Sequence, residues 1–173
     1  MRKLSSWLDS YLEYTENTES LDIFKVWCGV FCICSALQRK CYMYREKEIY
    51  PNMYIVIVAP SGCRKGTALG PAKDLVKSLG LKMAADATTR EALIEELEAS
   101  VYQDFPDDNT TILHNSLSIF SPELGVFLGK ENKQLILDLT DWYDCGDTWR
   151  YSTKHSGKNE ISGVWVNLIG ATT

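Results

Sequence analysis

The residues with the most specific chemistry form a short run, Ala59-Pro-Ser-Gly-Cys-Arg-Lys-Gly-Thr67, which follows an apolar strand-like segment and precedes a helical one. A phosphate-binding loop of the pattern G-x-x-x-x-G-K-[ST] needs this setting. Backbone N–H groups at the helix start surround an anion, and the lysine reaches the outer phosphates. We therefore predict that the loop binds nucleotide phosphates. The predicted nucleotide-binding residues are Pro60, Ser61, Gly62, Cys63, Arg64, Lys65, Gly66 and Thr67.

The loop departs from this pattern at three positions. Ala59 replaces the first glycine, Arg64 replaces the glycine before the lysine, and Gly66 stands where a magnesium-binding hydroxyl belongs. Thr67 follows one residue later, so we assign the metal-binding hydroxyl to Thr67. The alternative is that the run is an ordinary turn between a strand and a helix.

A second candidate lies where residues 117–123, Leu-Ser-Ile-Phe-Ser-Pro-Glu, end a predicted strand. In a Walker B strand, an acidic residue at this end holds Mg²⁺, and a glutamate that orients the attacking water often follows. Ser121 occupies the metal-carboxylate position, so we predict Glu123 as the catalytic carboxylate and as a magnesium ligand. The alternative is a glutamate placed near a helix start because the helix dipole favours it there.

Residues around the last predicted strand are candidates for contact with the γ-phosphate. Thr172 lies where a sensor residue would stand. Arg150, Lys154 and Lys158 precede that strand, where a cation can act as an arginine finger on a neighbouring subunit or contact DNA. A solvated charge in a loop is the more frequent outcome for such residues.

Strand-like and helical segments alternate along the chain and would position these residues. We predict an N-terminal helical segment over 1–40, with helices at 5–16 and 20–39, followed by a nucleotide-binding core over 41–173. Predicted strands are 53–58, 81–84, 111–120 and 163–169, and predicted core helices are 65–79, 88–102, 123–128 and 132–143. We expect residues 41–44 to pair with 53–58 as a hairpin, 105–110 to form a loop, and 145–159 to form a loop or hairpin. The alternation predicts an α/β fold with a mostly parallel sheet flanked by helices. Because the chain stops at the end of a predicted strand, we expect the core to continue beyond residue 173.

Composition sets limits on partners. The chain has 173 residues, 45% of them hydrophobic, which suits one domain with a buried core. A net charge of −5 gives no overall basic field, so contact with DNA requires a local patch or a ring of subunits with a basic pore. The most apolar segment, 26–37, is about a dozen residues against the roughly 20 of a spanning helix, so we expect no membrane association. Cys28 and Cys32 can share a metal on a helix, but we favour small core residues in a reduced cytoplasm.

The order of motifs resembles a phage and mobile-element primase–helicase family that carries a RecA-like P-loop ATPase domain and is similar to RepA-like replicative helicases. The segments that carry this resemblance are 50–67, 87–93, 121–125, 139–144 and 167–173. The resemblance implies a RecA-like P-loop NTPase that hydrolyses ATP with Mg²⁺ and moves on single-stranded DNA, as part of a full-length protein in a homo-oligomeric ring. It places Lys65 on the β- and γ-phosphates with a catalytic role, Glu123 at the catalytic carboxylate, and 169–173 at the sensor strand.

Three functions remain open from the sequence. The first is the motor core of a DNA helicase or primase–helicase. The second is a nucleotide-dependent switch or assembly module that binds ATP with little turnover, which the degenerate loop favours. The third is a small-molecule phosphotransferase.

Overall fold

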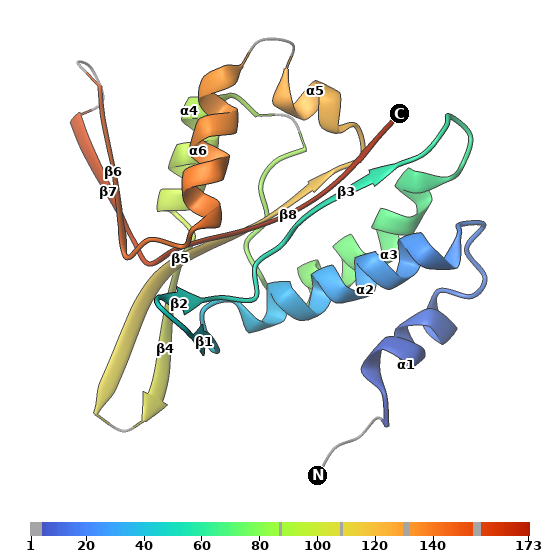
Figure 1. The fold of residues 1–173 in the computed structure, drawn as a ribbon, viewed down its shortest axis with the longest axis horizontal. Coiled ribbons are helices and arrows are strands. Elements are labelled where there is room, and N and C mark those ends of the chain that lie inside the picture. Colours follow the sequence, from blue (N-terminus) through green and yellow to red (C-terminus); the bar gives the residue numbers. More distant parts are fainter. Residues whose placement is uncertain (1–4, 87, 108, 130–131, 154–156) are drawn as a thin grey trace.

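The computed structural model describes residues 5–86, 88–107, 109–129, 132–153 and 157–173 (Figure 1). The helices are α1 (Trp7–Tyr14), α2 (Asp22–Leu37), α3 (Lys65–Ser78), α4 (Arg90–Glu98), α5 (Leu124–Leu128) and α6 (Lys133–Tyr143). The strands are β1 (Met43–Tyr44), β2 (Glu48–Ile49), β3 (Tyr54–Val58), β4 (Val101–Asp107), β5 (Thr110–Ser121), β6 (Thr148–Thr153), β7 (Gly157–Ser162) and β8 (Val164–Thr172).

The main sheet has four strands in the order β3-β8-β5-β4. β8 pairs in parallel with both β3 and β5, whereas β4 pairs with β5 in the antiparallel sense. β1–β2 and β6–β7 form two further two-stranded antiparallel sheets. The fold predicted from the sequence, a RecA-like, mostly parallel sheet flanked by helices, is therefore wrong: the described sheet is mixed and is accompanied by antiparallel hairpins.

The antiparallel edge arises where the sequence predicted the end of a helix over 88–102 and a loop over 105–110. Only residues 108–109 separate β4 from β5, and so short a connection joins strands only in the antiparallel sense. A proline such as Pro106 usually indicates a loop, but it is tolerated in an edge strand, and β4 is an edge strand. The register between the two strands shifts between Asp104 and Asp107, which accommodates the proline.

The predicted hairpin between 41–44 and 53–58 is also wrong. β1 instead pairs with β2, with Met43 opposite Ile49. β3 pairs with β8 in the sheet, where its residues Ile55 and Ile57 are buried in the core. The predicted strand at 81–84 is reduced to a single parallel bridge between Met83 and Ser118.

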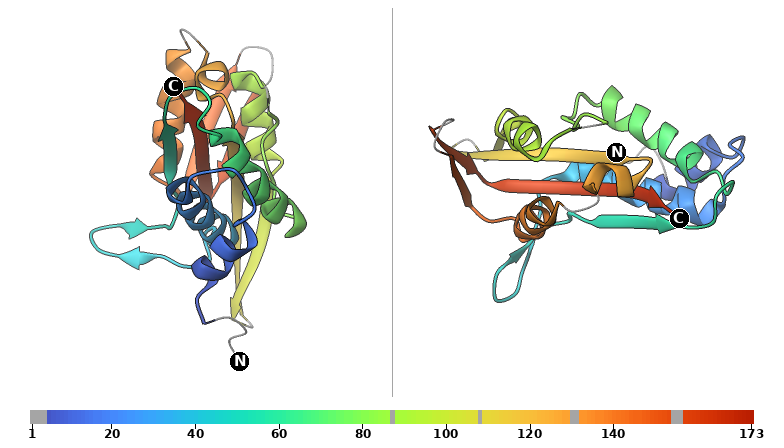
Figure 2. Two further views of the ribbon diagram at one scale, coloured as in Figure 1. Left: turned by 90° about the vertical axis from the view of Figure 1, so that its right-hand side faces the viewer. Right: turned by 90° about the horizontal axis from the view of Figure 1, so that it is seen from above.

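Helices cover both faces of the main sheet, with α1, α2 and α3 on one face and α4, α5 and α6 on the other (Figures 1 and 2). Successive side chains of β8 point to opposite faces of the sheet, so the strand contributes to the core on each face. Val166 and Leu168 pack into the core beside α4–α6, whereas Ile169 and Ala171 pack beside α2 and α3.

Two buried polar groups join α2 to the sheet. Asn167 of β8 accepts a hydrogen bond from the Met53 backbone N–H (2.9 Å) and donates to the Phe31 carbonyl (3.2 Å) and the Ser35 hydroxyl (2.9 Å). Arg39, just after α2, is 8% exposed and contacts the start of β8 at Val164. Its guanidinium donates to two backbone carbonyls, one tyrosine and one carboxylate, namely Cys145 (2.8 Å), Val164 (3.2 Å), Tyr50 (3.0 Å) and Asp147 (2.9 Å).

The two predicted N-terminal helices are present as α1 and α2. Ser6 caps α1 by accepting a hydrogen bond from the Asp9 N–H (3.3 Å). α1 packs closely on α2 at Gly29, where an added Cβ would lie 2.7 Å from Leu8. α2 begins at Asp22, two residues later than predicted, and Leu21 takes its N-cap position without a side-chain hydrogen bond. In the part of the chain that the structure describes, no helix is long and apolar enough to cross a membrane.

Candidate functional site

The predicted phosphate loop lies between β3 and α3, as the sequence indicated. β3 ends at Val58 and α3 begins at Lys65. β8 lies between β3 and β5, with Val58 opposite Thr172 and Gly170 opposite Ser121. The carboxyl ends of these three parallel strands therefore meet at one edge of the sheet, so the loop and the end of β5 lie near each other although about 60 residues separate them in sequence.

A hollow of about 480 Å³ opens at this edge. It is lined by loop residues, by the residues that follow β5 and by the last residue of the chain, namely Ser61, Gly62, Cys63, Arg64, Lys65, Gly66, Pro122, Glu123 and Thr173. The structure thus brings six of the predicted loop residues together with the predicted catalytic carboxylate. Three other predicted residues, Pro60, Thr67 and Thr172, are not among those that line it.

Lys65 is folded back over its own loop. Its ammonium donates to the backbone carbonyls of Ala59 (2.5 Å) and Pro60 (3.0 Å), and the side chain is half-buried. Pro60 therefore contacts the lysine although it does not line the hollow. A phosphate that binds the lysine must replace these carbonyl partners. An anion is the stronger partner, because a phosphate adds the attraction between opposite charges, which a neutral carbonyl lacks.

Arg64 has the backbone that the pattern assigns to glycine. Its φ of 55° and ψ of 29° lie in the left-handed region, immediately before the first residue of α3. Glycine adopts this conformation freely, whereas a residue with a Cβ is destabilised by about 1–2 kcal/mol. Gly62 has a φ of 87° and does have the residue type that its conformation favours. The substitution at Arg64 thus keeps the turn and adds a cation, at a cost in backbone strain.

Glu123 is exposed at the edge of the hollow. It occupies the N-cap position of α5, but its side chain makes no capping hydrogen bond. Its place at the start of α5 fits the alternative of a glutamate favoured there by the helix dipole, and its carboxylate is also accessible from the hollow.

The other metal-ligand candidates are less well placed. Ser121 is 1% exposed, so its hydroxyl is buried in the sheet. Thr67 is exposed on α3. Among the predicted metal ligands, Glu123 alone lines the hollow, so a Mg²⁺ ion there would take most of its ligands from phosphate oxygens and water, as Mg²⁺ commonly does. Within the described residues, no three His, Cys, Asp or Glu side chains are grouped to hold a metal, and Cys28 and Cys32 are buried free thiols.

Thr172 and the cations before β8 lie in different places. Thr172 is half-buried, and its carbonyl accepts a hydrogen bond from the Ala59 N–H (3.3 Å), so it holds the start of the loop. Arg150 pairs with Glu160 (3.0 Å) on the β6–β7 hairpin, at the end of the molecule opposite the hollow (Figures 1 and 2). Lys154 lies outside the described residues, and Lys158 lies in β7.

Sequence reasoning assigned no role to His114, which the structure places in a buried hydrogen-bonded group. Its Nδ1 lies 2.7 Å from the Ser116 hydroxyl and its Nε2 lies 3.0 Å from the Asp104 carboxylate. Burial lowers the pKa of His114, although Asp104 acts in the opposite direction. The group has the residue types of a hydrolase triad, but Ser116 is 1% exposed and its hydroxyl cannot meet a substrate. We therefore regard this group as structural. In the sequence, only the positions of Asp104 and Ser116, ten residues before and two residues after His114, pointed to it.

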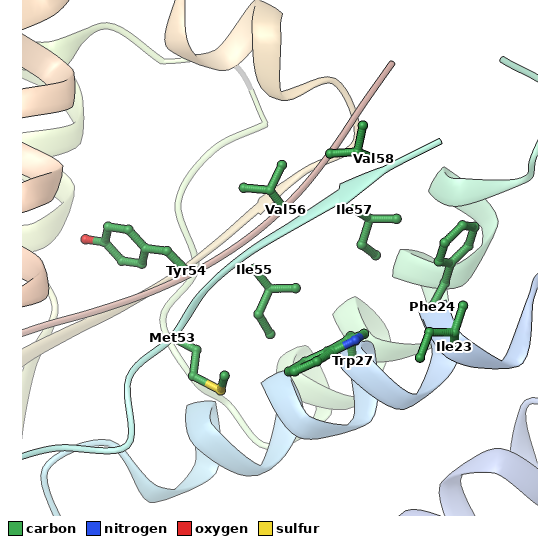
Figure 3. A pocket seen from close by; sticks show the side chains of 9 residues that line it. All are labelled: Ile23, Phe24, Trp27, Met53, Tyr54, Ile55, Val56, Ile57 and Val58. Carbon is green, nitrogen blue, oxygen red and sulfur yellow. The ribbon is translucent and has the colours of Figure 1, made fainter. Parts of the chain in front are cut away.

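Two apolar grooves run along β3. In the first, of about 430 Å³, Ile55 and Ile57 point toward Phe24 and Trp27 of α2 (Figure 3). The second, of about 420 Å³, lies on the other face and is lined by Tyr54, Val56, Leu124, Leu128, Ile136, Leu139, Thr140, Tyr143 and Leu168. A near-continuous apolar strand such as β3 is typical of a central position, but β3 is the edge of the described sheet, with Val56 47% exposed.

No known protein family matches the chain, and no curated protein is significantly similar to it.

Proposed function

We propose that the chain binds ATP with Mg²⁺ in the hollow between the phosphate loop and Glu123, and that it is the ATP-hydrolysing motor core of a DNA helicase or primase–helicase of phage or plasmid replication. The observation that carries the proposal is the hollow itself. It joins a strand–loop–helix unit, a lysine and an accessible glutamate that come from distant parts of the chain.

The loop residues have the chemistry that a triphosphate requires. The start of α3 presents backbone N–H groups and the positive end of a helix 14 residues long. Lys65 adds a cation that can move from the Ala59 and Pro60 carbonyls to a phosphate oxygen, and Arg64 adds a second cation. Bound Mg²⁺ would neutralise charge on the β- and γ-phosphates.

Glu123 supplies the group that hydrolysis requires. An exposed carboxylate at the edge of the hollow can accept a hydrogen bond from a water molecule and orient it toward the γ-phosphorus. In the proposed reaction the water oxygen forms the new bond to phosphorus, the bond to the β-phosphate oxygen breaks, and a water proton passes to solvent through Glu123.

The DNA-directed part of the proposal comes from the resemblance of the motifs. With a net charge of −5, the chain offers no general attraction for DNA, so we assign contact with single-stranded DNA to the full-length protein in a homo-oligomeric ring. The cytoplasm is the compartment that this role implies.

A specific observation favours a second candidate, a nucleotide-dependent switch or assembly module with little turnover. Ser121 stands where a metal-binding carboxylate is expected and is buried, and Thr67 lies outside the lining of the hollow. Weak positioning of Mg²⁺ would leave ATP binding intact and slow hydrolysis.

Steady-state ATP hydrolysis, measured with and without single-stranded DNA, separates the two candidates. The motor core predicts turnover that single-stranded DNA stimulates. ATP binding without DNA-stimulated turnover would contradict the motor core and favour the switch.

A further inference from the structure

The connection between α1 and α2 lies against the phosphate loop. We call residues 15–21 the linker segment. Glu19 of this segment forms an ion pair with Arg64, with 2.9 Å between Oε2 and Nη2. The Ser20 hydroxyl donates a long hydrogen bond to the Arg64 carbonyl (3.4 Å). A second hollow, of about 330 Å³, separates the two segments and is lined by Thr18, Glu19, Ser20, Leu21, Gly62, Cys63 and Arg64.

Arg64 therefore belongs to two hollows at once. It lines the proposed phosphate site on one side of the loop and the linker hollow on the other. Its left-handed backbone, fixed at the start of α3, sets where its side chain originates. The Arg64 side chain is 61% exposed, so its guanidinium can reorient. In the structure it is paired with the Glu19 carboxylate.

Carboxylate and phosphate compete for the same guanidinium geometry. Arginine binds both through a planar fork of N–H donors, and phosphate carries more charge and more acceptor oxygens. A polyphosphate in the site hollow would draw Arg64 away from Glu19. The linker segment would then lose its ion pair with the loop.

We propose that Glu19 withholds Arg64 from the phosphate site, and that the linker segment is a clasp which ATP binding releases. This inference rests on the proposed nucleotide-binding function and adds its regulation. Coupling between two sites is reciprocal, so a clasp that weakens ATP binding is itself loosened by ATP to the same extent. Whatever holds the linker segment on the loop, including contacts made by α1, lowers the affinity for nucleotide.

The size of the coupling follows from the exposure of the pair. Glu19 and Arg64 side chains are 76% and 61% exposed, and ion pairs of this kind change an equilibrium constant by up to about fivefold. We expect Glu19→Gln to tighten Mg·ATP binding by about two- to fivefold. Glu16→Gln is the matched control. Glu16 is an exposed glutamate of the same segment, and its substitution removes the same charge.

The test is calorimetric titration of Mg·ATP into the parent chain, Glu19→Gln, Glu16→Gln, Arg64→Gln and the double variant Glu19→Gln/Arg64→Gln. We expect tighter binding for Glu19→Gln, no change for Glu16→Gln, and no effect of Glu19→Gln once Arg64 is replaced. Equal effects of Glu19→Gln and Glu16→Gln would overturn the proposal, since they would reflect net charge. The proposal would also be overturned if Glu19→Gln tightened binding equally in the Arg64→Gln background. An unchanged affinity of Glu19→Gln for Mg·ATP would overturn it as well.

Amide hydrogen exchange of the linker segment gives a readout that does not depend on affinity. Arg64→Gln should speed exchange in residues 15–21 without any nucleotide, and Mg·ATP should speed it in the parent chain but not in Arg64→Gln. Slower exchange with Mg·ATP would overturn the clasp. If the parent chain binds ATP and Glu19→Gln changes nothing, the clasp fails while the proposed function stands. If no variant binds ATP, both fail.

Discussion

Replacing Arg39 with methionine removes the group that attaches the end of α2 to the sheet. The guanidinium is buried and donates to the backbone carbonyls of Cys145 and Val164, to the Tyr50 hydroxyl and to the Asp147 carboxylate. Methionine has a comparable unbranched stem but no donor. The substitution therefore leaves the two carbonyls without a partner in the interior.

The magnitude follows from these contacts. Each buried acceptor left without a partner costs about 1–3 kcal/mol. The ion pair contributes less, because the Asp147 side chain is 93% exposed and such pairs contribute about 0–1 kcal/mol. We expect Arg39→Met to lower the free energy of unfolding by about 2–6 kcal/mol, because two buried carbonyls each lose their donor.

Urea unfolding followed by tryptophan fluorescence measures this loss. Asp147→Asn is the control, because it removes the ion pair and keeps the carbonyl bonds, and we expect it to cost less than about 0.5 kcal/mol. If Asp147→Asn costs as much as Arg39→Met, the exposed ion pair makes the attachment and the reasoning from buried carbonyls is wrong. A loss below about 1 kcal/mol in Arg39→Met would refute it as well.

Three further predictions concern the core, the buried histidine and the site. Asn167→Leu should lower the free energy of unfolding by about 1–3 kcal/mol, because it leaves the Met53 N–H without its acceptor and removes the donor to the Ser35 hydroxyl; an unchanged free energy in urea unfolding would contradict this. Burial lowers the pKa of His114 below its ordinary 6.5, so the unfolded chain binds the proton more readily. The stability due to this residue is complete above about pH 6.5 and falls with decreasing pH, by at most about 1.4 kcal/mol per pH unit. Urea unfolding between pH 7.5 and 5 should show this slope in the parent chain and a shallower one in His114→Gln; equal slopes would remove His114 as the cause. Glu123→Gln should retain Mg·ATP binding and lose at least about 100-fold in turnover, the scale of a general base; unchanged turnover would exclude Glu123 from the mechanism.

The sequence predicted well those elements whose signal is local and strong. The apolar periodicity of α2, the glycine that follows α3 and the Leu117-Ser-Ile-Phe120 run of β5 each indicated the element that is present. Gly80, with a φ of 68°, ends α3 as a C-terminal glycine does.

The errors came from non-local pairing. Composition does not reveal that β4 is an edge strand in which Pro106 is tolerated. Nor does it reveal that β1 pairs with β2, while β3 belongs to the main sheet. A near-continuous apolar strand is typical of a central position. Whether a second strand pairs with β3 is not determined by the residues of β3 itself, and in the described sheet β3 pairs with β8 alone.

For the candidate site, the pattern located the loop and Glu123, which the fold brings to one hollow. Spacing alone predicted neither the burial of the Ser121 hydroxyl nor the exposure of Thr67 away from the hollow. Both depend on which face of its element, β5 or α3, the residue occupies. The pair between Glu19 and Arg64 joins residues 45 positions apart, and only the packing of the linker segment on the loop reveals it.

The most direct test of the central claim is calorimetric titration of ATP, with and without Mg²⁺, into the parent chain, Lys65→Ala and Lys77→Ala. Lys77 is the matched control, because it is an exposed lysine near the other end of α3. We predict Mg²⁺-dependent binding in the parent chain and in Lys77→Ala, and a loss of at least about tenfold in Lys65→Ala, the scale of one charge-assisted hydrogen bond. Equal binding by Lys65→Ala and the parent chain, or no binding by the parent chain, would contradict the assignment of this hollow as a nucleotide site.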